Sequence, residues 1–354
     1  MTRLTNTLNL NFLGAVILLC APIAAVAQDD PPNFLLIMVD DLGWTDIGAY
    51  GGEIDTPALD ALADKAVLFT DFHASVACSP TRSMLLTGTD NHIAGMGNMG
   101  ELLAPNQIGK PGYEGHLNNR VVTLAEVLRD NGYHTYMAGK WHLGHEPDHY
   151  PYNRGFEKTF SMLYGGASHF DDMTGVRELE SPAAYTLNGE RLWELPPTFY
   201  SSRSYADFLM DAIRSNRGNG KPLLGYFALT APHDPLHVPE PWKSKYQSAY
   251  DEGYEVLRQR RVEAAKDIGL VPSNAPVSEM QPQVKPRDTL SKEEQAVEVR
   301  GMEVYAGMVD NLDYHIGRVL DFLDDIGELD NTVIFFLSDD GSNGCVANFC
   351  LDQS

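Results

Sequence analysis

The feature that most constrains the fold is a set of short, uninterrupted apolar runs. The first run covers residues 34–39 (FLLIMV) and stops at Asp40 and Asp41. Apolar runs without polar alternation are typical of strands buried on both faces of a parallel sheet. Helix-like segments separate this run from three similar ones, at residues 133–138, 223–230 and 333–337. This order predicts an α/β fold with a mostly parallel central sheet flanked by helices.

Three of the segments outside the apolar runs contain sequence signals for the start of a helix. Capping signals occur at three places, residues 56–57 (Thr-Pro), 123–126 (Thr to Glu) and 291–294 (Ser to Glu). Residues 166–220 and 240–290 are polar, contain proline and show little periodicity. We therefore interpret these two stretches as insertions and surface loops.

The composition excludes several classes of protein. A hydrophobic share of 43%, with 10% aromatic residues, argues against a disordered chain. The formal net charge of −23 argues against a general nucleic-acid binder, which would carry a basic face. Four cysteines in 354 residues are too few to build a disulfide scaffold.

The first 27 residues have the pattern of a secretory signal. Arg3 precedes an apolar run over residues 11–20, and the small-residue sequence AVA then ends at Ala27. We expect cleavage near Ala27, a periplasmic or secreted protein, and a mature domain over residues 28–354. The apolar run is too short for a stable membrane span.

Each of the four apolar runs is followed by charged or histidine side chains, which can bind a metal ion or take part in catalysis. Because the carboxyl ends of parallel strands share one sheet edge, where open α/β sheets bind ligands, we expect these residues to converge. Two carboxylate pairs at one point repel each other unless a cation lies between them, and hard oxygen ligands suit Ca²⁺ or Mg²⁺. The residues are Asp40, Asp41, Lys140, His142, His233, Asp339 and Asp340.

A second candidate feature lies between the first two runs. Pro80 suits the first turn of a helix, with Ser79 as its cap and Gly88 as its end. Cys78 would then sit at a helix N-terminus, which favours anions, with Arg82 one turn further on. The alternative is that Cys78 is a small buried apolar residue in front of a helix. The residues alone leave both open.

The segment from Cys78 to Arg82 reads Cys-x-Pro-x-Arg, which resembles the signature of type I sulfatases. Other segments resemble the family's further motifs in the family's order, and together they cover nearly all of the mature chain. They are residues 33–46, 78–92, 132–144, 231–235 and 338–341. The resemblance implies an alkaline-phosphatase/sulfatase-like fold and a formylglycine-dependent bacterial arylsulfatase.

The resemblance also implies roles for the converging residues. A maturation enzyme would oxidise Cys78 to formylglycine, whose hydrate attacks the sulfur of a small-molecule or glycan sulfate ester. Arg82 would hold the modified side chain, and Lys140 would contact sulfate oxygens. His142 would hydrogen-bond the hydrate, and His233 would face the leaving group or the sulfate. One Ca²⁺ ion would be bound by Asp40, Asp41, Cys78, Asp339 and Asp340.

The chain departs from the family's usual pattern in two places. Asp340 stands where the family usually has asparagine, and the chain ends at Ser354, before the family's final strands and small C-terminal domain. We expect the catalytic domain to be incomplete at its C-terminus. After signal cleavage three cysteines remain, so Cys345 and Cys350 form a candidate tail pair, with Cys78 as the odd thiol.

Three functions remain open from the sequence. The first is hydrolysis of aryl or alkyl sulfate esters, which the motif set favours. The second is hydrolysis of phosphonate or phosphate esters by an enzyme of the same superfamily, because some relatives use formylglycine in this way. The third is an inactive, truncated sulfatase homologue, which the early chain end favours.

Overall fold

The computed structural model describes residues 30–280 and 284–342. The predicted signal peptide (residues 1–27) and the candidate pair Cys345 and Cys350 lie outside the described residues. Within the described residues, every helix is too short or too polar to serve as a membrane span.

The core of the fold is a seven-stranded sheet in the order β5-β4-β3-β2-β6-β1-β7. Strands β1, β2, β3, β6 and β7 run parallel, while β4 and β5 form an antiparallel extension beside β3. The fold class predicted from the apolar runs is therefore confirmed. The bounds are Asn33–Asp40 (β1), His134–Lys140 (β2), Lys158–Met162 (β3), Tyr185–Leu187 (β4), Glu190–Leu192 (β5), Leu223–Pro232 (β6) and Thr332–Ser338 (β7).

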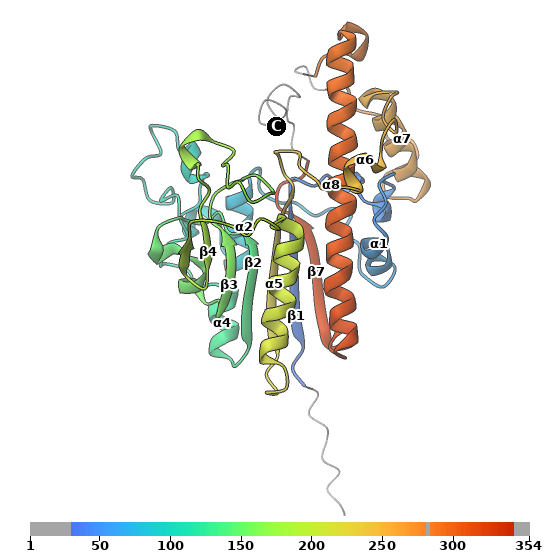
Figure 1. Ribbon diagram of the computed structural model, residues 1–354. Helices are drawn as coiled ribbons and strands as arrows, with labels where there is room; N and C mark the ends of the chain where they lie inside the picture. Colours follow the sequence, from blue (N-terminus) through green and yellow to red (C-terminus); the bar gives the residue numbers. More distant parts are fainter. Residues whose placement is uncertain (1–29, 281–283, 343–354) are drawn as a thin grey trace, which may run out of the picture. The chain divides into compact units, whose positions relative to one another are not determined.

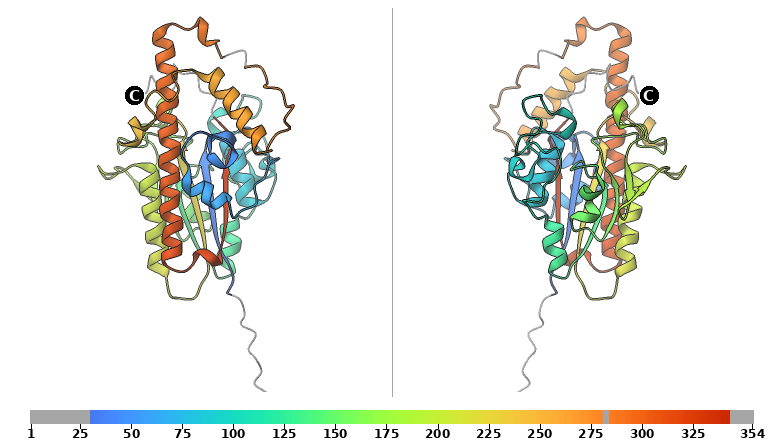
Figure 2. Two further views of the ribbon diagram at one scale, coloured as in Figure 1. Left: turned by 90° about the vertical axis from the view of Figure 1, so that its right-hand side faces the viewer. Right: turned by 90° about the vertical axis from the view of Figure 1, so that its left-hand side faces the viewer.

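Helices cover both faces of this sheet (Figures 1 and 2). The long helices α5 and α8 pack on one face, and α2 and α4 contribute to the other. The bounds are Pro57–Ala63 (α1), Cys78–Thr87 (α2), Asn91–Ala94 (α3), Leu124–Asp130 (α4), Ser201–Asn216 (α5), Trp242–Lys245 (α6), Tyr254–Asp267 (α7) and Lys292–Asp325 (α8).

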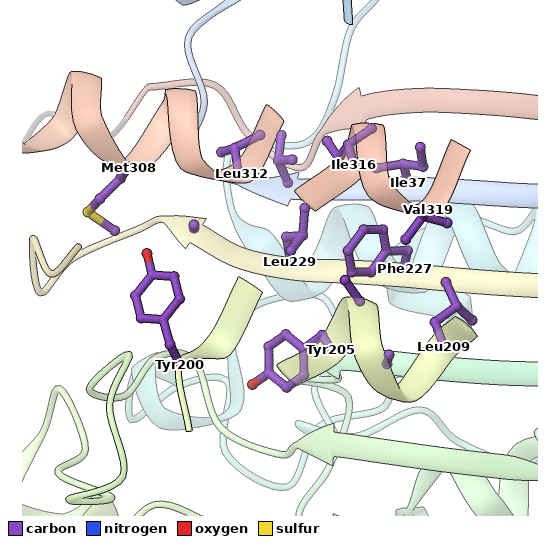
Figure 3. Close-up of a cluster of buried hydrophobic side chains, with 14 of the residues drawn as sticks. Ile37, Tyr200, Tyr205, Leu209, Phe227, Leu229, Met308, Leu312, Ile316 and Val319 are labelled. Atoms are coloured by element: carbon purple, nitrogen blue, oxygen red, sulfur yellow. The ribbon is translucent and has the colours of Figure 1, made fainter. Parts of the chain in front are cut away.

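The larger apolar cluster lies between the sheet and the α5–α8 pair (Figure 3). Phe227 from β6 and Leu209 from α5 meet Leu312 and Ile316 from α8, and all four side chains are fully buried. Burying one such side chain stabilises the fold by roughly 1.5–3 kcal/mol. This layer therefore fixes β1 and β6, whose carboxyl ends carry predicted site residues.

The structure corrects the interpretation of residues 166–220 and 240–290 as loops. Helix α5 lies inside the first stretch and is a core helix, with its buried face at Tyr205, Leu209 and Ile213. Strands β4 and β5 extend the sheet from the same stretch. The second stretch contains α6 and α7. Polar outer faces and prolines in the connections obscured these elements.

Three of the predicted helix starts are confirmed, those of α1, α4 and α8, whereas the cap of α2 differs from the prediction. Thr123 and Ser291 each make the reciprocal capping-box hydrogen bonds with the Glu three residues later. Proline 57 opens α1. Helix α2 begins at Cys78 with Ala77 as its cap, so the prediction of Ser79 as cap was wrong. Gly88 ends α2, as predicted, and its backbone is in the left-handed region (φ 61°).

Candidate active site

The strand ends that were expected to converge are neighbours in the sheet. Strands β2, β6, β1 and β7 follow one another in the strand order, and all four are parallel. Their carboxyl ends therefore share one edge (Figure 1), and the N-terminus of helix α2 lies at that edge, because Cys78 Sγ is 3.6 Å from Asp340 Oδ2. The structure places the predicted residues at these ends: Lys140 on β2, His142 just beyond it, His233 after β6, Asp40 and Asp41 on and after β1, and Asp339 and Asp340 after β7.

Gly139 shows how closely the strands approach beside the site. A β-carbon at this position would lie 1.7 Å from the carbonyl oxygen of Ala228 on β6, and the residue has a φ of +121°. Only glycine combines that backbone conformation with so close a contact. Glycine at this position therefore lets β2 deliver Lys140 against the end of β1.

Arg82 connects three elements of the site. Its side chain is fully buried, and its Nε and Nη2 donate to Asp339 Oδ2 at 3.0 and 2.8 Å. Its Nη1 donates to the carbonyl oxygen of Lys140 at 2.9 Å. Burial alone would raise the pKa of Asp339, but Arg82 and Lys140 outweigh it and hold the pKa well below its usual range. Arg82 thus anchors α2 to β7 and β2 and keeps Asp339 ionised.

Lys140 forms the second buried ion pair. Its Nζ lies 2.8 and 2.6 Å from the two carboxylate oxygens of Asp40, and both side chains are fully buried. Burial and the neighbouring Asp339 raise the pKa of Asp40 to about 6, so Asp40 is ionised at neutral pH. Burial disfavours the ammonium, yet the carboxylate of Asp40 raises the pKa of Lys140. Two of the three ammonium protons bind Asp40, which leaves one for a ligand.

Cys78 occupies the first position of α2 and is 6% exposed. Its Sγ lies 3.6 Å from Asp340 Oδ2. Burial raises the pKa of the Cys78 thiol far above its ordinary value, and the surrounding carboxylates add to that effect while Lys140 opposes it. Because the thiolate is the nucleophilic form of cysteine, the unmodified residue is a poor nucleophile here.

The carboxylates around Cys78 form a donor set for a cation. Ligand atoms within 4.8 Å of one another occur in three overlapping groups. Asp340 Oδ1 is buried and has no hydrogen-bond partner among the described residues. Burial and the charge of Asp339 raise the pKa of Asp340 to about 8. The groups are Asp40, Cys78 and Asp339; Asp40, Asp41 and His233; and Asp41, Cys78 and Asp340.

This arrangement fits a hard divalent cation such as Ca²⁺. Oxygen atoms supply two of the three donors in each group, and a bound cation would supply the partner that Asp340 Oδ1 lacks among the described residues. Asp41 reaches the cluster with a left-handed backbone (φ 64°), which is uncommon outside glycine. The residues predicted as metal ligands are therefore brought together, and their occupation by Ca²⁺ stays a prediction.

His142 is held by a residue that the sequence did not reveal. Glu101, in a short 3₁₀ turn (Gly100–Leu102), lies 2.9 Å from His142 Nε2 through its Oε1. Burial lowers the pKa of His142 to about 4, and the hydrogen bond with His142 lowers the pKa of Glu101 to about 2. At neutral pH the imidazole is therefore neutral, with Nε2–H donating to the carboxylate. His142 Nδ1 is then a bare acceptor, buried and without a partner among the described residues.

The backbone of His142 is left-handed (φ 54°), as is that of Asp41.

His233 lies beside the carboxylates of the site. His233 directs Nδ1 to the carbonyl oxygen of Asp234 at 2.6 Å, and its Nε2 lies 3.5 Å from Asp41 Oδ2. Burial would lower the pKa of His233, but the nearby carboxylates of Asp40 and Asp41 raise it above its ordinary value. His233 is therefore a candidate proton donor at the rim of the carboxylate cluster.

Comparison with known proteins decides the family. The Sulfatase family profile matches residues 32–345. The chain belongs to the sulfatase family. An uncharacterised sulfatase of Schizosaccharomyces pombe is 48% identical over 331 residues, which cover 90% of this chain and 59% of that protein. An arylsulfatase of Klebsiella aerogenes is 39% identical, with 93% of this chain and 70% of that protein covered.

A solved structure gives the same fold. The sulfatase-like protein YidJ of Bacteroides fragilis superposes with a TM-score of 0.65 at 22% identity, covering 90% of this chain and 63% of that chain. The sulfatase-like architecture expected from the motifs is thus confirmed. This chain spans 59%, 70% and 63% of the lengths of these three proteins.

Proposed function

We propose that this protein hydrolyses sulfate esters, with Cys78 oxidised to formylglycine as the precursor of the nucleophile. The observation that supports this most is the setting of Cys78 in a sulfatase-family chain. Its buried thiol is held neutral beside four carboxylates, Lys140 and Arg82, so its ordinary thiolate chemistry is suppressed. A maturation enzyme, with an external two-electron oxidant such as dioxygen, would break the C–S bond of CH₂–SH, form the C=O bond of an aldehyde in its place, and release the sulfur as sulfide.

The proposed reaction proceeds in two steps. Water adds to the aldehyde and gives a hydrate with two hydroxyl groups. One hydroxyl oxygen attacks sulfur, the S–O bond to the alcohol or phenol breaks, and the sulfate becomes attached to the hydrate. The second hydroxyl then loses its proton, its oxygen forms the C=O bond, and the C–O bond to sulfate breaks. Sulfate leaves, and the aldehyde is restored.

Each neighbouring side chain has a task in this scheme. The remaining proton of Lys140 would bind a sulfate oxygen, and its charge would stabilise the transition state. His233 would donate a proton to the leaving oxygen, consistent with its raised pKa. Neutral His142, with Nδ1 free of a proton, suits the removal of the hydrate's second proton. Arg82 would keep α2 and its first residue in place.

The carboxylate cluster would hold the Ca²⁺ ion through Asp40, Asp41, Asp339 and Asp340, together with modified Cys78. When bound, such an ion supplies Lewis-acid polarisation of a sulfate oxygen and favours ionisation of the attacking hydroxyl. We further propose a small-molecule or glycan sulfate ester as substrate, and export to the periplasm or the exterior after cleavage near Ala27.

Mass spectrometry and a paired assay test this proposal. The protein would be purified from a host with an active maturation system, and the mass of the Cys78 peptide measured. We expect the mass of an aldehyde in place of a thiol. We also expect hydrolysis of 4-nitrophenyl sulfate to exceed hydrolysis of 4-nitrophenyl phosphate, and Cys78→Ala to lower it by at least about a thousandfold.

Two controls make the result decisive. Cys78→Ser tests whether a single hydroxyl can replace the hydrate, and we expect little turnover because it lacks the second hydroxyl. An unconverted Cys78 peptide together with no sulfate ester hydrolysis would refute the catalytic proposal for this chain. Faster phosphate than sulfate ester hydrolysis would instead support the phosphate-ester alternative.

A further inference from the structure

A groove separate from the Cys78 site opens between helices α5 and α8. Its volume is about 500 Å³, and it is lined by aromatic rings and a few polar groups. Asn311, on α8, is one of the residues that line the groove. It comes six positions after Tyr305, which marks the part of α8 beside the Cys78 site because its hydroxyl contacts Asp46 and the backbone of Asp41. Six helical residues correspond to about 9 Å along the helix axis, and the lining of the groove includes none of the residues of the Cys78 site.

Asn311 is the most unusual residue in this groove. Its side chain is fully buried, and neither its amide nitrogen nor its amide oxygen has a hydrogen-bond partner among the described residues. The neighbouring polar residues on α8 are satisfied: Asp310 accepts from Trp242 and Tyr246, and Asp313 accepts from two backbone N–H groups. A buried amide with both ends unpaired destabilises the free protein. A ligand in the groove would supply the missing hydrogen-bond partners and so account for the unpaired amide.

The aromatic rings give the groove a wall for a ring-shaped ligand. Trp242 and Tyr314 lie 5.4 Å apart between ring centroids with planes inclined by 49°. Tyr314 is 51% exposed, and Phe170 and Tyr200 line the same space. Faces of this kind pack against the C–H face of a sugar ring, while its hydroxyl groups pair with a donor and an acceptor. The Asn311 amide offers one of each.

The rim of the groove adds a positive charge. Arg203 lies in the first turn of α5, is exposed, and makes no hydrogen bond or ion pair with the described residues. Arg318, also at the groove, already pairs with Asp207. An unpaired guanidinium in a chain of net charge −23 favours an anionic group, which it can bind with two parallel hydrogen bonds.

We propose that the α5–α8 groove binds an anionic saccharide, a sugar ring with free hydroxyls and one sulfate or carboxylate substituent. The ring lies against Trp242 and Tyr314, a hydroxyl group pairs with Asn311, and the anionic substituent reaches Arg203. The groove binds without chemistry. The inference rests on the groove alone and does not depend on the reaction proposed at Cys78.

Fluorine NMR on the full chain tests this directly. The chain has four tryptophans, so 5-fluorotryptophan labelling gives four probes, and Trp242→Phe assigns the groove signal. A Cys78→Ala background keeps the probe, N-acetylglucosamine 6-sulfate, intact. We expect it to shift the Trp242 signal saturably, with inorganic sulfate and unsulfated N-acetylglucosamine each producing a weaker effect.

Two groove variants and one control sharpen the test. Arg203→Gln and Asn311→Leu should each weaken binding at the Trp242 signal by about tenfold, because each loses a hydrogen bond to the ligand. Arg203 is exposed, so its variant should fold even if Asn311→Leu does not. Arg258→Gln, a change at a half-buried arginine outside the groove, should leave binding unchanged.

The same spectra contain the contrary outcomes. Trp44 and Trp141 lie beside the residues of the Cys78 site in sequence and report binding there. The proposal is overturned if the sugar sulfate moves only those signals, or if Arg203→Gln leaves the Trp242 response intact. It is also overturned if inorganic sulfate alone reproduces the response, which would mean an anion site without sugar recognition. Loss of sulfatase activity would not alter any of these readings.

Discussion

The two halves of the candidate active site differ in charge although one sheet edge builds both. The carboxylate half, at the ends of β1 and β7, contains Asp40, Asp41, Asp339 and Asp340. The basic half, at the ends of β2 and β6, contains Lys140, His142 and His233. Arg82 lies between the halves and bonds to Asp339 in one and to the Lys140 backbone in the other.

The difference shows how one site can hold ligands of opposite sign. In the carboxylate half, Asp40 and Asp339 have buried cationic partners, but Asp340 has an unpaired oxygen and a raised pKa. Asp340 is thus the carboxylate of this half that forms no ion pair with the described residues. In the basic half, Lys140 keeps a free proton and His142 a free Nδ1. The first half therefore suits a cation, and the second suits an anionic substrate.

The largest expected effect comes from breaking the connection between the halves. Arg82→Met should lower the free energy of unfolding by about 3–5 kcal/mol, because it leaves the buried carboxylate of Asp339 without its partner. Urea denaturation of the full chain measures this. Arg260→Met removes an exposed ion pair with Glu252 and should cost less than about 1 kcal/mol. Equal losses in the two variants would show that Arg82 does not hold the site together.

The next effect concerns a cation bound by the carboxylate half. Calcium at a hundredfold excess over its dissociation constant should stabilise the folded chain by about 2.7 kcal/mol, and a chelator should reverse this. Differential scanning calorimetry with CaCl₂ and with EDTA gives the two melting temperatures. Asp340→Ala should reduce the calcium-dependent rise while leaving the EDTA melting temperature at or above that of the parent protein.

A matched variant guards this result. Asp324→Ala removes an exposed carboxylate near the C-terminal end of α8 and should keep the full calcium response. If Asp340→Ala retained the same calcium-dependent rise as Asp324→Ala, Asp340 would have no part in a cation site.

The smallest expected effect is in the basic half, where His142 makes the free energy of unfolding depend on pH. Burial lowers the pKa of His142 to about 4, so the unfolded chain takes up a proton below about pH 6.5 that the folded chain refuses. The stability contributed by neutral His142 is therefore present above pH 6.5 and is lost as the pH falls toward 4. His142→Asn should reduce the loss of unfolding free energy between pH 7 and pH 5 by about 1–2 kcal/mol.

Urea titrations at the two pH values provide the measurement. His73→Asn changes an exposed imidazole and should leave the pH dependence as in the parent protein. A pH dependence unaltered by His142→Asn would mean that His142 is not held neutral by burial.

The sheet and the gathering of the site residues could be predicted from sequence for one physical reason. Continuous apolar runs favour strands that are buried on both faces, and parallel strands bring their ends to a common edge. Strands β1, β2 and β6 are buried as expected, whereas β7 is at the end of the strand order and exposes Val333 and Phe335. Asp40, Lys140 and His233 could therefore be placed together although they lie far apart in the chain. The direct contact between Lys140 and Asp40 was not predicted, because spacing along the sequence does not specify which side chains pair.

Other features escaped prediction for identifiable reasons. Glu101 lies in a loop without a recognisable motif, and only the tertiary fold of that loop brings it to His142. Helix α5 did leave a signal, since Tyr205, Leu209 and Ile213 keep helical spacing, but the polar residues and prolines around it led to the interpretation as a loop. The α5–α8 groove depends on tertiary packing and has no sequence pattern.

The left-handed backbones of Asp41 and His142 have a consequence for how such a protein can change. Each residue occupies a conformation that glycine adopts at lower cost, so each stores a small strain in the folded chain. Substituting glycine at either position would relieve that strain while deleting a functional group. A library screened for heat resistance alone would therefore tend to accumulate changes at these two residues. Screening for thermal survival and for turnover would pull the same two residues in opposite directions.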